Sequence, residues 1–179
     1  MTPQQNETLT RVGPGTPGGE MLRRYWWPVG FDEEIKKKPV PVRHLGEAFV
    51  LFRDGAGTIG MLDIVCSHRS ASLEYGRVEE RGLRCCYHGW LYDACGNCLE
   101  MPAEPPGSTL HKDVRHRAAS VQVVAGLVFA YIGPSPAPIL PRYDLLWLDD
   151  CDRTIWAGDD FCNWVQRAEN GTDAYHSMA

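Results

Sequence analysis

The chain has 179 residues and a formal net charge of −5, with both signs spread along the sequence. This length can bury one full hydrophobic core, and the dispersed charge provides no basic face for nucleic acid. The longest apolar run, residues 121–132, is too short and too interrupted to cross a membrane. Seven cysteines are an odd number for a secreted disulfide framework, and residues 1–19 contain no apolar signal core. We therefore expect a soluble cytoplasmic protein with reduced thiols that binds neither nucleic acid nor membrane.

The start of the chain predicts little regular structure. Residues 1–19 contain closely spaced glycines and prolines, so we expect an irregular arm. Helix-forming residues follow at positions 20–27 with apolar side chains at helical spacing, and Pro28 cannot continue that helix. The prediction is an arm followed by one short helix.

From residue 40 onward the pattern is that of short antiparallel strands separated by glycine turns. The expected strands are residues 41–45, 47–53, 58–64, 121–124 and 127–132. His44 falls inside one of these strands and is interpreted as structural. His111 and His116 lie in a charged stretch and are expected to be exposed. The central part of the chain is therefore predicted to be one all-β domain.

Two short motifs between these strands each combine a cysteine with a histidine. Cys66-Ser67-His68 is followed, after sixteen intervening residues, by Cys85-Cys86-Tyr87-His88. Two cysteines and two histidines are the ligands of a mixed-ligand 2Fe–2S cluster, in which the cysteines bind one iron and the histidines bind the other. The interval has room for a strand, a turn and a returning strand, so two loops could hold a cluster from opposite sides.

Two other interpretations of these residues were weighed against the cluster. A zinc site can use two cysteines and two histidines, but its usual sequence groups the cysteines in one pair and the histidines in another. A disulfide between Cys66 and Cys85 would leave both histidines unexplained. We therefore predict a cluster with Cys66, His68, Cys85 and His88 as its ligands.

The stretch from Cys66 to Tyr92 resembles the Rieske iron–sulfur proteins. Its flanks, residues 69–73 and 89–93, resemble the Rieske oxygenases in particular. The resemblance implies a mainly β Rieske domain of short antiparallel strands with two cluster-binding loops. It also favours Cys85 over Cys86 as the ligand, because the second loop of the family has the spacing C-x-x-H.

The C-terminal part of the chain changes character after a group of prolines at residues 134–141. Residues 154–156 predict a strand, and residues 160–176 predict a helix with Asp160 as its cap. Asp173 and His176 are three positions apart and would share a helix face, although Gly171 could interrupt the helix just before them.

The expected organisation has three parts. Residues 1–27 form the N-terminal arm and short helix, and residues 28–133 form the Rieske 2Fe–2S domain. Residues 134–179 form a linker and the first strand and helix of an α+β catalytic domain.

Residues 163–176 resemble the beginning of the catalytic domain of Rieske oxygenases. The resemblance implies that His176 is one ligand of a mononuclear Fe(II) and that Asp173 is a catalytic carboxylate. In the family this carboxylate connects the iron ligand to a Rieske histidine of the neighbouring subunit in a trimer, and the matching histidine here is His88. The alternative is an ordinary surface pair on a helix. The family's second histidine and distant carboxylate do not appear before Ala179.

Two functions remain open from the sequence. Residues 9–17 and 21–29 look like the phthalate and phenoxybenzoate dioxygenase branch, which implies the terminal oxygenase (alpha) subunit of a homotrimeric, multicomponent oxidoreductase. Electrons would come from an NAD(P)H-dependent reductase, and the direct partner would be an iron–sulfur flavin reductase or a ferredoxin. They would pass through the 2Fe–2S cluster to the mononuclear Fe(II), where O2 is used to hydroxylate or oxidatively dealkylate an aromatic compound. The alternative is a Rieske ferredoxin-like electron carrier without substrate chemistry, which residues 163–176 disfavour.

Overall fold

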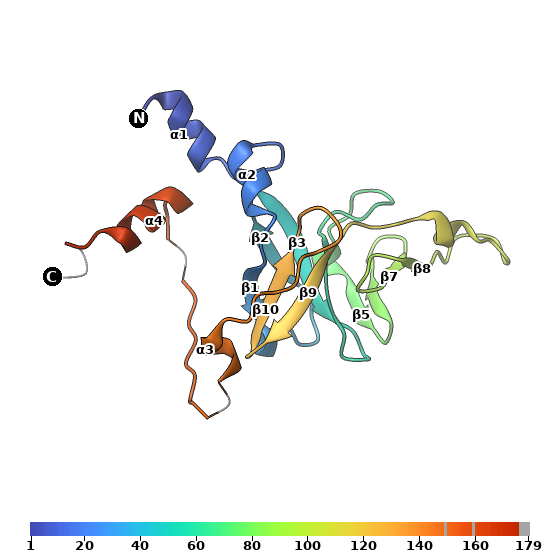
Figure 1. Ribbon diagram of the computed structural model, residues 1–179. Coiled ribbons are helices and arrows are strands. Elements are labelled where there is room, and N and C mark those ends of the chain that lie inside the picture. Colours follow the sequence, from blue (N-terminus) through green and yellow to red (C-terminus); the bar gives the residue numbers. More distant parts are fainter. Residues whose placement is uncertain (149, 159, 176–179) are drawn as a thin grey trace.

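The computed structural model describes residues 1–148, 150–158 and 160–175. Within these ranges the chain is mainly β, with two antiparallel sheets and a few short helices. Figure 1 shows the strands in the centre of the molecule, with the N-terminal helices at one end and the smaller sheet at the other. The mainly β class predicted from the sequence is confirmed.

The larger sheet has six strands in the order β1-β10-β9-β4-β3-β2. These strands are β1 (Trp27–Phe31), β2 (Val40–His44), β3 (Glu47–Arg53), β4 (Ile59–Asp63), β9 (Ala118–Val124) and β10 (Leu127–Tyr131). The residues at both central positions of the β2–β3 and β9–β10 turns, Leu45-Gly46 and Ala125-Gly126, have positive φ. Tight hairpins need this conformation to match the twist of their strands. The predicted strands are therefore confirmed, with bounds that differ by up to three residues.

The smaller sheet is inserted between β4 and β9. Its four strands, in the order β5-β6-β7-β8, are β5 (Arg77–Glu79), β6 (Gly82–Arg84), β7 (Leu91–Tyr92) and β8 (Cys98–Glu100). Single-turn helices lie at η1 (Asp32–Glu34), η2 (Leu73–Tyr75) and η3 (Leu110–Asp113). The β5–β6 hairpin occupies the interval between the two cysteine–histidine motifs, as their spacing predicts.

The two sheets share a hydrophobic core. Val50 and Phe52 on β3 and Leu62 on β4 pack in one cluster with Leu83 and Tyr92 from the smaller sheet, and all five are fully buried. The two cysteines that begin the motifs belong to the same cluster. Burial of this apolar surface stabilises the contact between the sheets, and close packing fixes the motif loops relative to each other.

The N-terminal segment differs from the prediction in two places. Helix α1 (Pro3–Thr10) forms where the sequence predicts an irregular arm, because Thr2 starts it with a capping box. Helix α2 covers Pro17–Leu22 and ends before Trp26, whose indole donates a hydrogen bond to the carbonyl of Pro138. The predicted helix over residues 20–27 is therefore wrong in its second half, where packing against the sheet outweighs helix propensity.

The C-terminal segment lacks the predicted strand. Helix α3 (Asp144–Trp147) is a single turn, and residues 154–156 have no strand pairing. The side chain of Trp156 is 81% exposed, so this stretch does not pack as a strand of a sheet would. Among the residues that the structure describes, no helix has both the length and the apolar character needed to cross a bilayer.

The predicted C-terminal helix is shorter than expected. Helix α4 spans Trp164–Thr172, and Asn163 rather than Asp160 caps its start. Asp173 follows the helix with extended backbone angles, φ −78° and ψ 106°. Asp173 therefore lies beyond the helix, which corrects the prediction that the helix continues through it. His176 itself lies outside the described residues.

Candidate metal centre

The first motif forms a closed loop at the end of β4. The N–H group of Cys66 donates a hydrogen bond to the carbonyl of Ala71 (2.9 Å), and Ser70 N–H donates to the carbonyl of Cys66 (3.0 Å). Ser70 has a left-handed backbone with φ 55°. These bonds hold Cys66 at the base of the loop and present the residues after it at the tip.

The second motif, between β6 and β7, repeats this arrangement. Cys85 N–H donates to the carbonyl of Trp90 (2.8 Å), and Gly89 N–H donates to the carbonyl of Cys85 (3.2 Å). Gly89 has φ 74° and stands four positions after its cysteine, as Ser70 does in the first loop. Cys66 and Cys85 are therefore structurally equivalent, whereas Cys86 lies one position into its loop and is exposed.

The two equivalent cysteines are buried together. Their exposed fractions are 2% for Cys66 and 4% for Cys85, and both are free thiols, which removes the disulfide interpretation. Burial raises the pKa of the Cys85 thiol. The N–H groups of Tyr87 and His88 lower that pKa, and the neighbouring Cys66 raises it. A bound metal ion deprotonates a coordinating thiol outright, so two buried sulfurs side by side can serve as metal ligands despite the raised pKa of Cys85.

The two motif histidines form a second pair. The ring centres of His68 and His88 are 4.6 Å apart. The His68 ring stacks on the Trp90 ring, with 4.4 Å between the ring centres and an interplanar angle of 3°. The ring centres of Tyr87 and His88 are 3.8 Å apart. The Nδ1 atom of His68 is buried and has no hydrogen-bond partner among the described residues. A buried ring nitrogen without a partner is costly unless something binds it, and a metal ion is one such partner.

This donor set fits a two-iron cluster better than a single metal ion. A tetrahedral zinc site needs its four ligands around one point. Among residues 1–148, 150–158 and 160–175, no three histidine, cysteine or acidic side chains converge on one position for a metal ion. A mixed-ligand cluster requires only two sulfurs at one iron and two imidazoles at the other. The pairing of thiols with thiols and imidazoles with imidazoles meets that requirement.

A buried tyrosine contacts one of the sulfurs. The hydroxyl of Tyr92 lies 3.3 Å from Sγ of Cys66, and Tyr92 is completely buried on β7. Burial raises the pKa of Tyr92, with the nearby Cys66 adding to the effect, so the phenol keeps its proton. When Cys66 is a thiolate, the phenol is therefore the donor. In the sequence, Tyr92 is only the last residue of the stretch that resembles the Rieske proteins, and its spacing alone gives no sign of this contact.

Arg84 holds the second loop from beneath. Its guanidinium donates to the carbonyl of Gly89 (2.6 Å), to both carboxylate oxygens of Glu79 (2.7 and 2.8 Å) and to Glu100 (2.6 Å). The Arg84 side chain is only 16% exposed, so these charge-assisted bonds are partly shielded from water. The hydrogen bond to Arg84, together with the Arg77 guanidinium, lowers the pKa of Glu79 to about 2 despite some desolvation.

Arg84→Met is expected to destabilise the protein by about 2 kcal/mol at neutral pH, since it removes charge-assisted hydrogen bonds at a partly buried site. Because the pKa of Glu79 is lower in the folded state than in the unfolded chain, ionised Glu79 stabilises the folded protein above pH 4.5. This stabilisation is lost as the pH falls toward 2. The stability difference between wild type and variant should therefore shrink across that window. Urea unfolding at several pH values measures this difference.

Arg81→Met is the matched control for Arg84→Met. Arg81 is 60% exposed and pairs with Glu100 at the surface, so its loss should cost little. Equal destabilisation by the two substitutions, or a constant difference between wild type and Arg84→Met from pH 7 to pH 3, would contradict the role given to Arg84.

His116 is buried rather than exposed, which corrects the prediction from the sequence. Only 4% of its surface is accessible, and its ring bonds to Ser67 Oγ (2.6 Å) and to the carbonyl of Asp63 (2.8 Å). The charged neighbours of His116 in the sequence suggest a solvated segment. The chain instead turns there so that the ring lies under the first motif loop. His111 is half-buried at the surface.

Of the two C-terminal site residues the structure describes only Asp173, which follows α4 and is not brought to the motif loops of its own chain. Asp173 is exposed, and its Oδ1 accepts a hydrogen bond from Tyr175 N–H (3.0 Å). In Figure 1, α4 lies beside the N-terminal helices, at the opposite end of the molecule from the smaller sheet. Consistently, the indole of Trp164 donates to the carbonyl of Leu9. His176 lies outside the described residues.

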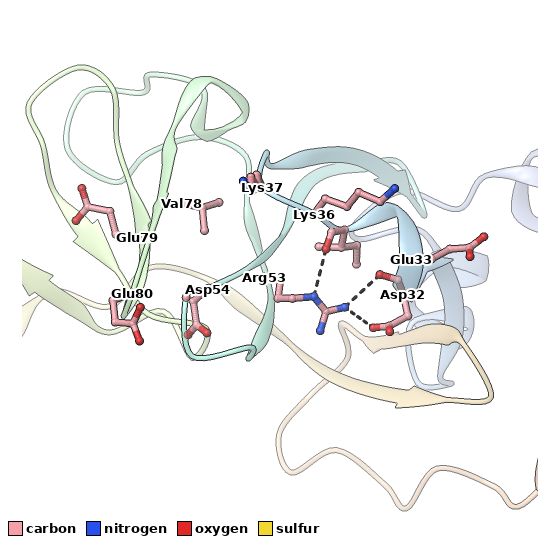
Figure 2. A pocket seen from close by; sticks show the side chains of 11 residues that line it. Asp32, Glu33, Lys36, Lys37, Arg53, Asp54, Val78, Glu79 and Glu80 are labelled. Atoms are coloured by element: carbon pink, nitrogen blue, oxygen red, sulfur yellow. Dashed lines mark hydrogen bonds and ion pairs between the residues drawn. The ribbon is translucent and has the colours of Figure 1, made fainter.

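A broad groove of about 770 Å³ lies apart from the motif loops (Figure 2). It is bounded by η1 and the residues after it, by the β3–β4 turn and by the β5–β6 turn. Its lining is mostly charged, and Arg53 is already bonded to Asp32 and to the carbonyl of Ile35. None of the predicted site residues lines this groove, so it is not part of the metal centre.

Comparison with known proteins agrees with this geometry. Residues 25–125 match the family described as the Rieske [2Fe-2S] domain. The chain is 45% identical to the 5,5'-dehydrodivanillate O-demethylase oxygenase subunit of Sphingobium sp. (strain NBRC 103272 / SYK-6), over 98% of this chain and 42% of that protein. It is 45% identical to the phenoxybenzoate dioxygenase subunit alpha of Ectopseudomonas oleovorans, over 94% of this chain and 42% of that protein.

Two further proteins, one curated relative and one solved structure, are also similar to this chain. The tert-butanol monooxygenase / tert-amyl alcohol desaturase oxygenase subunit of Aquincola tertiaricarbonis is 47% identical over 96% of this chain and 37% of its own length. A solved complex between oxygenase and ferredoxin in carbazole 1,9a-dioxygenase contains a chain with a TM-score of 0.58 and 29% identity, covering 66% of this chain and 31% of that one. This chain therefore spans about two-fifths of the length of the curated relatives that it matches.

Proposed function

The chain belongs to the Rieske [2Fe–2S] domain family, and from this premise we propose that it acts in the terminal oxygenase component of a multicomponent Rieske non-heme iron oxygenase. The observation that carries the proposal is the extent of the similarity. Relatives named as oxygenase subunits match 94–98% of the chain. These matches include residues outside 25–125, the range that the family model covers. An electron carrier needs only the cluster domain, so the ferredoxin-like alternative leaves the C-terminal segment without a role.

In this proposal Cys66 and Cys85 bind one iron, and His68 and His88 bind the other. The equivalent positions of the two cysteines, their burial and the unpartnered Nδ1 of His68 support the assignment. The bound cluster supplies reversible transfer of one electron. The protein's own residues hold it in place: Trp90 orients the His68 ring by stacking, and Tyr92 donates a hydrogen bond to the Cys66 sulfur.

The C-terminal residues take their proposed roles from the same resemblance. His176 is one ligand of a mononuclear Fe(II), and Asp173 is the carboxylate that accepts hydrogen bonds from His176 and from His88 of a neighbouring subunit in a homotrimer. The exposed position of Asp173 at the end of α4 supports a contact with another subunit. A carboxylate between two imidazoles orients both rings and fixes their tautomers. The mononuclear iron supplies the activation of O2.

The substrate we propose is an aromatic compound that is hydroxylated or oxidatively dealkylated. The O-demethylase and phenoxybenzoate names of two relatives support this class. The relative named for tert-butanol shows that similarity of this degree also extends to tertiary alcohols. The electron donor is an iron–sulfur flavin reductase or a ferredoxin, as the solved oxygenase–ferredoxin complex of a relative supports. We place this system in the cytoplasm.

The proposal predicts the metal content of anaerobically prepared protein. We expect two irons and two acid-labile sulfides per chain for the cluster, with the EPR spectrum of a reduced mixed-ligand cluster. In a chain of the full length of its relatives we expect a third iron without sulfide, which His176→Ala removes while the cluster signal stays. A full-length chain that binds only the cluster iron would favour the electron-carrier alternative. Zinc in place of iron and sulfide would refute both functions.

A further inference from the structure

His116 lies under the first motif loop and is held on both sides of its ring. Its backbone N–H donates to the carbonyl of Gly96 (2.7 Å), which anchors the residue to the β7–β8 turn. Its Nδ1 is 2.6 Å from Ser67 Oγ, and its Nε2 is 2.8 Å from the carbonyl oxygen of Asp63. Ser67 stands between two proposed ligands, and Asp63 ends the strand that leads into the loop.

The chemistry of these partners sets the direction of both hydrogen bonds. A carbonyl oxygen can only accept, so Nε2 of His116 carries the proton and donates to Asp63. In the neutral imidazole Nδ1 is then an acceptor, and the Ser67 hydroxyl donates to it. Burial lowers the pKa of His116, which agrees with a neutral ring. Both bonds tie the first loop to a single rigid side chain.

The same imidazole also packs against the tyrosine that contacts the cluster sulfur. The ring centres of His116 and Tyr92 are 4.6 Å apart, with an interplanar angle of 32°. The Tyr92 hydroxyl lies 3.3 Å from Sγ of Cys66. His116 therefore contacts both the loop that carries Cys66 and the residue that donates to Cys66, while its own hydrogen bonds go to Ser67, Asp63 and Gly96.

We propose that His116 is a positioning residue for the cluster, which holds Ser67 and Tyr92 so that the Cys66 sulfur receives its hydrogen bond in a fixed geometry. This inference rests on the proposed function, because it takes Cys66 as a cluster ligand. Reduction adds negative charge to the cluster, and a hydrogen bond to a ligand sulfur stabilises the reduced state. Loss of the His116 anchor therefore lowers the reduction potential.

The test is the reduction potential and the EPR spectrum of the cluster-loaded full chain. His116→Phe keeps a ring of similar size but forms neither hydrogen bond. We expect it to lower the ratio of reduced to oxidised cluster at a given applied potential by about tenfold, which is ~59 mV for one electron. His116→Gln, whose amide offers one donor and one acceptor, should recover most of that shift. Ser67→Ala should produce a smaller shift in the same direction.

The control is His111→Phe, the same substitution at a histidine on η3 beside a surface pocket, which should leave the potential unchanged. A His116→Phe protein with wild-type potential and EPR spectrum would show that only the volume of the ring matters and would overturn the proposal. If the His116→Phe protein does not hold a cluster, the reduction potential of Ser67→Ala tests the proposal instead. Ser67 is exposed, so replacing its hydroxyl leaves the hydrophobic core intact. An unchanged potential in Ser67→Ala would then also overturn it.

The spectrum of the wild-type protein distinguishes a failure of the proposed function from a failure of the positioning role alone. If the wild-type chain shows no mixed-ligand cluster signal, the proposed function fails, and the positioning role fails with it. If the wild type shows that signal and the His116 and Ser67 variants match it, only the positioning role fails.

Discussion

Cys85→Ser is expected to abolish the cluster, whereas Cys86→Ser should leave it in place. Cys85 occupies the same position in its loop as Cys66, with matching backbone hydrogen bonds to the residues four and five positions later. Its sulfur is buried next to Cys66, while Cys86 is exposed. A serine hydroxyl stays protonated at neutral pH and is a poor substitute for the soft thiolate that iron–sulfur clusters require.

Iron and acid-labile sulfide per chain, together with the visible absorption spectrum, measure this effect. The two substitutions are matched in chemistry and differ by one position, so they separate a ligand from a neighbouring thiol. A Cys86→Ser protein that loses the cluster while Cys85→Ser retains it would reverse the assignment. The second loop would then bind through C-x-H, and the structural equivalence of Cys66 and Cys85 would have no bearing on the ligands.

Asp173→Asn is expected to slow electron delivery to the mononuclear iron by about 10- to 100-fold, the range typical of residues that orient metal ligands. The experiment needs a chain with the full length of its relatives, assembled with its partner subunits. A carboxylate can accept N–H hydrogen bonds from two imidazoles at once, whereas an amide presents one acceptor and one donor. The cluster content and its EPR spectrum should remain those of the wild type, because Asp173 lies far from the motif loops of its own chain.

Single-turnover oxidation of the reduced cluster, followed by its absorbance, measures this rate directly. Asp160→Asn is the matched control, because Asp160 precedes the same helix and pairs with Arg167 at the surface. Unchanged cluster oxidation in Asp173→Asn would show that Asp173 is an ordinary surface carboxylate. A loss of the cluster itself would instead point to a structural role within one subunit.

The cluster motif could be identified from the sequence because its information is local. Each cysteine stands two or three positions from its histidine, and a tight loop brings such residues together whatever the rest of the chain does. The hairpin strands were predictable for the same reason. Short apolar runs and turn glycines such as Gly46 act over a few positions, so β3 was predicted at its observed bounds.

The helices were predicted less well because their bounds depend on distant contacts or on single caps. The segment up to Trp27 has helical spacing, but Trp26 donates to Pro138 and Trp27 pairs with Ala130 in the sheet. In the C-terminal segment, Asn163 caps α4, and the helix stops before Asp173. Neither choice follows from periodicity, since several residues there could start or end a helix.

By itself, the sequence indicated the mainly β class, the strands β2–β4, β9 and β10, and the two cysteine–histidine motifs, because these signals are local along the chain. The four cluster ligands remain a prediction, in which the resemblance selects Cys85. Only the tertiary structure shows which side chains surround the two motif loops. Tyr92 on β7 contacts Cys66 of the first motif loop, and His116 in the segment before β9 contacts Ser67 of the same loop, across 26 and 49 positions of the chain. Contacts of this kind leave no periodic signal, because they depend on how two sheets pack and not on which residues are neighbours in sequence.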